Sequence, residues 1–260
     1  MPSLKLAIHL RSLRLPLKRA LHVAAELGVA AVEIDGRGEI NPQEITSTGL
    51  RQIRKSFDDY QLRVSAVEFH TRRGYDVQDD LARRVEATKA AMKMAHGLGA
   101  SLVINQIGRV PEDDQSPAWR LLTDVLADLG RYGQHCGALL AAETGSESGP
   151  QLQKLVAALP PGSLAVTLNP GKLLINGFAP LDAIAALGDD IRYVHVQDGV
   201  QDRATGRGTE VALGRGSADF PALLGALEER GYQGYFCILR EQSNDPVTDI
   251  GQAVQYLRSL

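Results

Sequence analysis

Residues 138–169 read ALLAAETGSESGPQLQKLVAALPPGSLAVTLN and contain two apolar runs separated by a helix-like segment. Ala138–Thr144 and Leu164–Asn169 are short, apolar and typical of buried strands, whereas Leu152–Leu159 repeats its apolar residues at helical spacing. The Pro-Pro-Gly stretch at residues 160–162 indicates a turn between the helix and the second strand. Parallel neighbouring strands need a crossover connection, so the segment predicts one βαβ unit.

The same alternation runs through the whole chain. The strand-like runs are Leu4–Leu10, Ala31–Asp35, Arg63–His70, Leu102–Ile107, Ala138–Thr144, Leu164–Asn169, Ile191–Gln197 and Tyr235–Arg240. The helix-like segments are Leu17–Leu27, Leu50–Tyr60, Leu81–Leu98, Trp119–His135, Leu152–Leu159, Leu181–Leu187, Phe220–Glu229 and Val247–Leu257. This rhythm over 260 residues predicts an α/β protein with one domain, a single (β/α)8 TIM barrel over residues 1–260. An open doubly wound sheet is the alternative, but the turn after the first strand, residues 10–14, lacks the glycines that such a sheet usually has there.

The composition excludes several classes of protein. Hydrophobic residues make up 44% and charged residues 23%, with a net charge of −3, which is typical of a folded globular chain rather than a disordered one. The slight acidity disfavours nucleic acid as a partner. No apolar run is long enough for a membrane helix, and the first residues lack a secretory signal pattern, so we expect a cytoplasmic protein without a membrane partner. The two cysteines form no metal-type pair.

Functional residues of such barrels lie at the carboxyl ends of the strands. Read in order, these ends carry the polar residues Arg11, Glu33, Asp35, Glu68, His70, Asn105, Gln106, Glu143, Asn169, His195, Asp198, Arg240 and Glu241. Strand side chains alternate between two faces, so an inward Glu143 implies that Asn169 and His195 share its rim. A carboxylate, an amide oxygen and an imidazole that converge there could hold a divalent ion.

At these residues the chain resembles a known family. Ala142-Glu143 ends the fifth strand, residues 194–198 (VHVQD) end the seventh, and residues 213–216 (LGRG) precede Asp219-Phe220. Together with the eight-unit rhythm, these motifs are similar to those of the xylose-isomerase-like TIM barrels, which include sugar and sugar-phosphate isomerases and epimerases, inosose dehydratases and, more distantly, endonuclease IV. The resemblance implies one divalent metal (Mn, Mg, Co or Zn) held by Glu, Asp, His and Glu from strands five to eight, with the two Glu residues as an acid/base pair.

The chain departs from that pattern at half of the implied ligands. Glu143 and His195 match, but Asn169 stands where Asp is implied, and Lys172 stands where a substrate-contacting His often follows. Leu239 stands where the strand-eight Glu is implied, and Glu241 lies roughly 6.6 Å further along the same face. Hard cations depend on anionic oxygen ligands, so the metal set Glu143, Asn169, His195 and Glu241 would be weakened, and the cofactor is one such metal or none.

Several of these residues have a structural alternative. His195 is either a ligand or a hydrogen-bonded relic, and Glu143 is paired with either a metal or Lys172, because a buried carboxylate is costly without a partner. Asn169 also suits a turn before Pro170-Gly171, and His70, like His9, is either a pocket residue or a packed one. The backbone of residues 214–216 (GRG) either cradles a phosphate or forms a simple loop.

Basic side chains crowd the expected rim loops, and guanidinium groups bind carboxylates and phosphates in a bidentate manner. We therefore expect a small sugar, sugar phosphate or other anionic metabolite as the partner. The expected substrate-binding residues are Arg11, His70, Arg109, Asn169, Asp198, Arg215 and Arg240. Self-association into a homo-oligomer is left open.

Three functions compete. The first is a sugar or sugar-phosphate isomerase or epimerase, in which Glu143 abstracts a proton next to a carbonyl while His195, and Lys172 in a metal-poor version, stabilise the enediolate. The second is a non-catalytic or reassigned barrel that binds an anionic metabolite after loss of the metal site. The third, a zinc-cluster DNA-repair enzyme like endonuclease IV, conflicts with the six histidines and the acidic charge of the chain.

Overall fold

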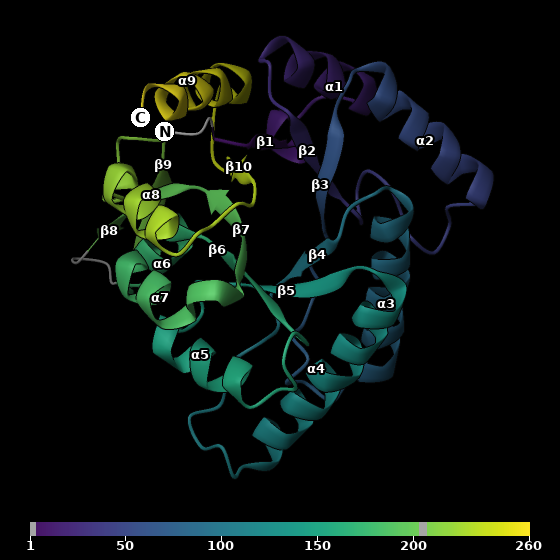
Figure 1. Ribbon diagram of the computed structural model, residues 1–260, viewed down its shortest axis with the longest axis vertical. Coiled ribbons are helices and arrows are strands. Elements are labelled where there is room, and N and C mark those ends of the chain that lie inside the picture. The colour runs from purple at the N-terminus through teal and green to yellow at the C-terminus, as the bar shows by residue number, and fades with distance from the viewer. Residues whose placement is uncertain (1–3, 203–206) are drawn as a thin grey trace.

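The computed structural model describes residues 4–202 and 207–260, and a closed parallel barrel forms its centre (Figure 1). Around the barrel the strand order is β1-β10-β7-β6-β5-β4-β3-β2. The barrel strands are β1 (Leu6–His9), β2 (Ala31–Asp35), β3 (Arg63–Glu68), β4 (Leu102–Asn105), β5 (Leu139–Glu143), β6 (Ala165–Leu168), β7 (Ile191–Val196) and β10 (Phe236–Ile238). The predicted fold is confirmed, because every strand-like run contains one barrel strand.

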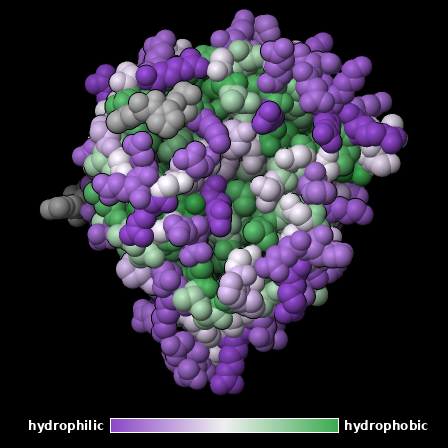
Figure 2. All heavy atoms as spheres, in the orientation of Figure 1, coloured by the Kyte–Doolittle hydropathy of each residue, from purple (hydrophilic) through white to green (hydrophobic). Residues whose placement is uncertain are grey.

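Helices surround the barrel (Figure 1). They are α1 (Leu17–Glu26), α2 (Ser47–Asp59), α3 (Leu81–Gly97), α4 (Pro117–Cys136), α5 (Gly149–Ala157), α6 (Pro170–Ile175), α7 (Pro180–Leu187), α8 (Phe220–Glu229) and α9 (Pro246–Ser259), with 3₁₀ turns η1 (Leu10–Leu13) and η2 (Gly188–Asp190). Hydrophilic side chains dominate the outline of the face in Figure 2, as expected of helices whose outer sides are solvated. Among the described residues, no helix is long and apolar enough to cross a membrane.

Apart from the 3₁₀ turns, three elements were not predicted: two strands and one short helix. An antiparallel pair, β8 (Asp198–Asp202) and β9 (Arg207–Val211), follows β7 directly. The short helix α6 begins immediately after β6, where Asn169 caps its first turn by accepting a hydrogen bond from the Lys172 backbone N–H at 2.9 Å. Pro170 at the first helical position needs no hydrogen-bond partner for its nitrogen, which explains why the helix can start there.

The barrel interior is narrow and filled mostly by small side chains. The interior cluster consists of five alanines and Cys237 together with three larger residues; its members are Ala7, Ala31, Ala66, Ala141, Ala165, Cys237, Leu102, Ile104 and Tyr193. Tyr193 spans this interior, and its hydroxyl group lies 2.7 Å from Ser65 Oγ, so the buried phenol has a polar partner. A larger apolar core lies between the strands and the helices. Because most of these inner side chains are apolar, the polar side chains at the carboxyl ends of the strands are the part of the barrel where chemistry is possible.

Candidate active site

Four barrel strands place a buried ionisable side chain at the barrel mouth. Glu33 comes from β2, Glu68 from β3, Glu143 from β5 and His195 from β7, and each of these residues is less than 5% exposed. Burial of a carboxylate is costly unless cations or hydrogen-bond donors surround it. The mouth must therefore supply several positive partners for its carboxylates.

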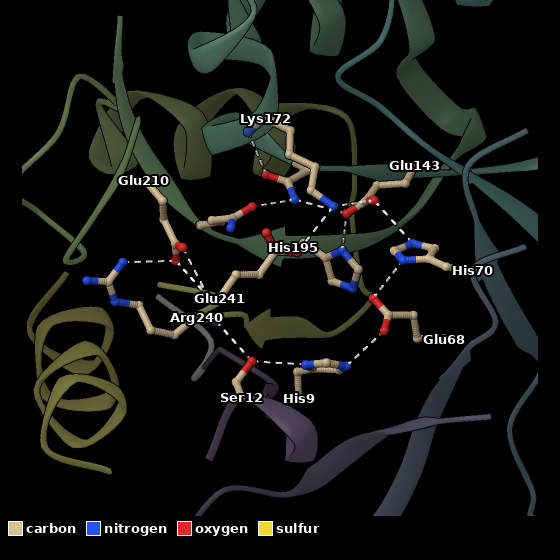
Figure 3. Close-up of polar contacts among 12 residues, drawn as sticks. His9, Ser12, Glu68, His70, Glu143, Lys172, His195, Glu210, Arg240 and Glu241 are labelled. Carbon is tan, nitrogen blue, oxygen red and sulfur yellow. Dashed lines mark hydrogen bonds and ion pairs between the residues drawn. The ribbon is translucent and has the colours of Figure 1, made fainter. Parts of the chain in front are cut away.

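Glu143 is the centre of the first group of contacts (Figure 3). Its Oε1 lies 2.7 Å from His195 Nδ1 and accepts a hydrogen bond from Asn169 Nδ2 at 2.9 Å. Its Oε2 lies 2.8 Å from Lys172 Nζ and 3.5 Å from His70 Nε2. Burial disfavours the Glu143 carboxylate, but Lys172 and His195 outweigh burial and hold its pKa well below the usual range. Glu143 is therefore fully ionised at neutral pH.

His195 lies between two carboxylates and has no exposed surface. Nδ1 faces Glu143, and Nε2 faces Glu33 Oε2 at 2.9 Å and Oε1 at 3.1 Å. Carboxylate oxygens only accept hydrogen bonds, so both ring nitrogens carry protons and the ring is an imidazolium. Burial opposes this charge, but Glu33 and Glu143 raise the pKa of His195 to about 10. Both nitrogens of this ring are therefore engaged by carboxylates in this structure.

Lys172 extends from α6 to a position between two carboxylates. Its Nζ contacts Glu143 at 2.8 Å and Glu241 Oε1 at 3.6 Å, and its side chain is 15% exposed. Burial alone would lower the pKa of Lys172, but Glu143 and Glu241 raise it above its usual value. The cation is therefore permanent, and its partly exposed side chain lies, like that of His70, on the solvent side of the mouth.

The side chains at the family's metal position do not fit a divalent ion as they stand. Asn169 turns its amide nitrogen toward Glu143 and toward Gln197 Oε1, and its oxygen is used by the Lys172 N–H. His195 is protonated on both nitrogens, and the Lys172 ammonium lies between Glu143 and Glu241. A dication at this position would be repelled by the Lys172 ammonium, and the carboxylates that it needs as ligands are already paired with that ammonium. In this arrangement Glu143, Asn169, His195 and Glu241 are therefore not a set of ligands for a divalent ion.

A second group of contacts surrounds Glu68, at the ends of β1 and β3. Glu68 Oε2 lies 3.3 Å from His9 Nε2, and Oε1 lies 3.5 Å from His70 Nδ1. Burial would raise the pKa of Glu68, but His9 and His70 lower it to about 2; burial would lower the pKa of His9, but Glu68 raises it to about 8. Within the described part of the chain, His9, Glu33 and Glu68 form one group whose potential ligand atoms all lie within 4.8 Å of one another. The sequence placed these residues at strand ends but did not indicate that they meet.

The predicted substrate-binding residues divide between the mouth and its surroundings. His70 and Asn169 lie in the mouth, and both contact Glu143. Arg11 is exposed and pairs with Asp35 at 3.0 Å, whereas Arg109 and Arg215 are exposed on rim loops. Arg240 is 3.0 Å from both Glu210 and Asp249, so it joins β9 to α9. For the exposed arginines, substrate contact stays a prediction.

Asp198 has a structural function that the sequence did not reveal. Its carboxylate accepts hydrogen bonds from the backbone N–H groups of residues 199, 214, 216 and 218 at 2.8, 3.0, 2.8 and 3.1 Å. A Cβ atom on Gly216 would lie only 2.1 Å from Asp198 Oδ1, which explains the glycine. Two of the N–H groups proposed as a phosphate cradle, those of residues 214 and 216, therefore already bind an anion of the protein itself.

Comparison with known proteins identifies the family and agrees with the fold. The chain belongs to the xylose isomerase-like TIM barrel family, whose profile matches residues 21–260. It is 25% identical to fructoselysine 3-epimerase of Escherichia coli O157:H7 over 95% of this chain and 94% of the relative. It is 23% identical to inosose dehydratase of Bacillus anthracis over 73% of each chain. A xylose isomerase domain protein from Planctomyces limnophilus superposes with a TM-score of 0.88 at 25% identity, covering 99% of this chain and 97% of that one. The two sequence relatives are therefore named as an epimerase and a dehydratase.

Proposed function

We propose that this protein is a sugar or sugar-phosphate isomerase or epimerase that removes a proton from the carbon next to a ketone. The observation that carries the proposal is the contact of 2.8 Å between Glu143 Oε2 and Lys172 Nζ at the barrel mouth. A carboxylate and a permanent cation side by side are the two groups that enolisation needs, a base for the proton and a charge for the developing oxyanion. The named relatives support this reaction class.

The low pKa of Glu143 in the free protein fits this function only if Lys172 is redirected by the substrate. A ketose that docks at the mouth meets Lys172 and His70 first, because they are the partly exposed members of the group. Transfer of the Lys172 ammonium from Glu143 to the substrate oxygen removes the nearest cation from the carboxylate and raises its basicity. His195 and Asn169 keep Glu143 in place, so they act as positioning residues.

Glu241 is proposed as the second acid/base group. It lies on the other side of Lys172, with Oε1 3.6 Å from Nζ, and its side chain is 49% exposed. An epimerase must return the proton to the opposite face of the carbon, so a second carboxylate across the cation suits that reaction. A 1,2-isomerase needs only one base, so the effect of removing Glu241 distinguishes the two reactions.

Deuterium exchange tests this proposal without knowledge of the product. The protein is incubated in D₂O with fructose, fructose 6-phosphate and fructoselysine, and NMR follows exchange of protons next to the ketone. We expect exchange for at least one compound, slowed by about 10²–10⁴-fold in Glu143→Gln. Glu44→Gln, an exposed site, is the matched control.

The competing function, binding of an anionic metabolite without chemistry, predicts a different result. Calorimetry would then detect binding of a sugar phosphate, and Lys172→Met would weaken it, while no proton exchanges in any of the three compounds. That pattern would overturn the enzymatic proposal.

A further inference from the structure

Three buried residues beside the Glu143–Lys172 pair have no part in the proposed proton transfer. His9 ends β1, Glu33 lies in β2 and Glu68 ends β3, and their potential ligand atoms lie within 4.8 Å of one another. All three residues are less than 5% exposed. One imidazole and two carboxylates in such proximity form a donor set that suits a first-row divalent metal.

His9 has a nitrogen whose orientation is unexplained by hydrogen bonding. Its Nε2 is buried and has no hydrogen-bond partner among the described residues, although Glu68 Oε2 lies 3.3 Å away. The distance is short, but the geometry is not that of a hydrogen bond. The other nitrogen, Nδ1, is 2.9 Å from Ser12 Oγ, and this oxygen accepts the Arg240 backbone N–H at 3.0 Å. In the free protein Glu68 favours a proton on this ring by raising the pKa of His9, so a metal ion would displace that proton when it binds. A ring fixed through one nitrogen with the other one directed at carboxylates is the usual arrangement of a metal-binding histidine.

Glu68 is also held loosely for a buried carboxylate. Its contacts with His9 and His70 are 3.3 and 3.5 Å, whereas charge-assisted hydrogen bonds are usually about 2.7–2.9 Å long. Glu33 has short contacts, but both involve the same partner, His195 Nε2. Each carboxylate therefore has oxygen lone pairs that the observed protein contacts do not use fully.

The separation of His9 and Glu68 matches that of two ligands of one zinc ion. Two donors at about 2.0–2.1 Å from a tetrahedral ion lie about 3.3 Å apart. The distance between His9 Nε2 and Glu68 Oε2 is 3.3 Å. We propose that His9, Glu33 and Glu68 form a site for a zinc-like dication, with Co²⁺ as its spectroscopic substitute.

This site differs from the position that the family resemblance implies. It uses the ends of β1, β2 and β3, whereas the family set corresponds to residues 143, 169, 195 and 241. Three protein ligands leave a fourth position for water or a hydroxyl group of a ligand. The proposal does not depend on the proposed isomerase chemistry, because none of its ligands is the proposed base or cation.

Metal binding by the untagged, chelator-treated full chain tests the proposal. Equilibrium dialysis against Zn²⁺ followed by elemental analysis gives the stoichiometry, and Co²⁺ titration gives the visible absorption of a tetrahedral complex. We expect about one equivalent. Loss of a group that only orients a ligand costs about 10–100-fold in affinity, so we expect Ser12→Ala to weaken binding within that range and His9→Gln and Glu68→Gln by about 100-fold or more.

Two control variants locate the ion. His22→Gln removes an exposed histidine of α1, and Glu241→Gln removes a carboxylate of the family position; both should bind as the original chain does. Binding of less than about a tenth of an equivalent by the original chain would overturn the proposal. Binding that persists in both His9→Gln and Glu68→Gln, or that disappears in Glu241→Gln, would also overturn it. Circular dichroism verifies folding, and Ser12→Ala remains informative if a ligand variant does not fold.

Discussion

The Lys172 ammonium lies nearer to Glu143, at 2.8 Å, than to Glu241, at 3.6 Å, although it contacts both. The buried carboxylate holds the cation, and the exposed carboxylate is free to exchange its contact for solvent or ligand. The two proposed acid/base groups therefore differ: Glu143 is buried and held as an anion, whereas Glu241 is in contact with solvent.

Lys172→Met tests how much of the stability depends on this pair. Removal of one partner leaves a buried carboxylate with fewer cations, which costs about 3–5 kcal/mol when nothing else compensates. His195 and Asn169 remain in contact with Glu143, so we expect the lower end of that range. Urea denaturation measures the change, and Lys172→Arg should recover most of it. Equal stability of Lys172→Met and the original chain would contradict the pairing.

Asn169→Asp should destabilise the protein in a pH-dependent manner. The substitution replaces an N–H donor that serves Glu143 and Gln197 with a carboxylate next to another carboxylate. The repulsion raises the pKa of the new Asp in the folded state, so stability is lost as pH rises through the range above the unfolded pKa of about 3.9. We expect a loss of about 2 kcal/mol at pH 8 relative to the original chain, and a smaller one at pH 5. Denaturation of both proteins at the two pH values measures this difference.

Glu147 should make the protein less stable as the pH rises from mild acid to neutrality. It is 5% exposed in the loop between β5 and α5, and burial raises its pKa from 4.5 to about 7. The folded state binds this proton more tightly than the unfolded state, so stability falls as pH rises from about 4.5 to 7 and then levels off. Glu147→Gln should therefore be more stable at pH 8, by at most about 3 kcal/mol, with no gain near pH 4.5. A constant difference between the proteins across this range would contradict the assignment.

Asp198→Asn should release the segment that precedes α8. The variant loses the charge that accepts four backbone N–H groups and cannot accept as many with an amide group. A hydrogen bond to a charged group contributes about 1.5–3 kcal/mol, so we expect a total loss of a few kcal/mol. Hydrogen exchange should accelerate at residues 214, 216 and 218. Asp182→Asn, an exposed position in α7, is the control, and unchanged exchange in Asp198→Asn would refute the anchor.

Most of the fold could be predicted from periodicity, because each strand and helix has its own local pattern of apolar residues. The strand ends Glu143 and His195 could likewise be placed on one rim from alternation along their strands. The helix α6 could have been predicted, since Asn169 followed by Pro170 is a strong cap signal. The proximity of His9, Glu33 and Glu68 could not be predicted, because it depends on barrel curvature and on side-chain rotamers. The contacts of Asp198 were not predicted either, because its partners are backbone N–H groups and the glycines at 214 and 216 were interpreted as a phosphate cradle or a simple loop.

Ser12 joins the first and the last barrel strand of the chain. Its hydroxyl oxygen touches His9, which ends β1, and accepts the N–H of Arg240, which follows β10, while β1 and β10 pair as neighbours in the barrel. The barrel mouth therefore depends on a contact between Ser12 and Arg240, which lie 228 positions apart in the sequence. Without β10 the barrel would be open beside β1, so the surroundings of His9 are complete only when the last strand is in place.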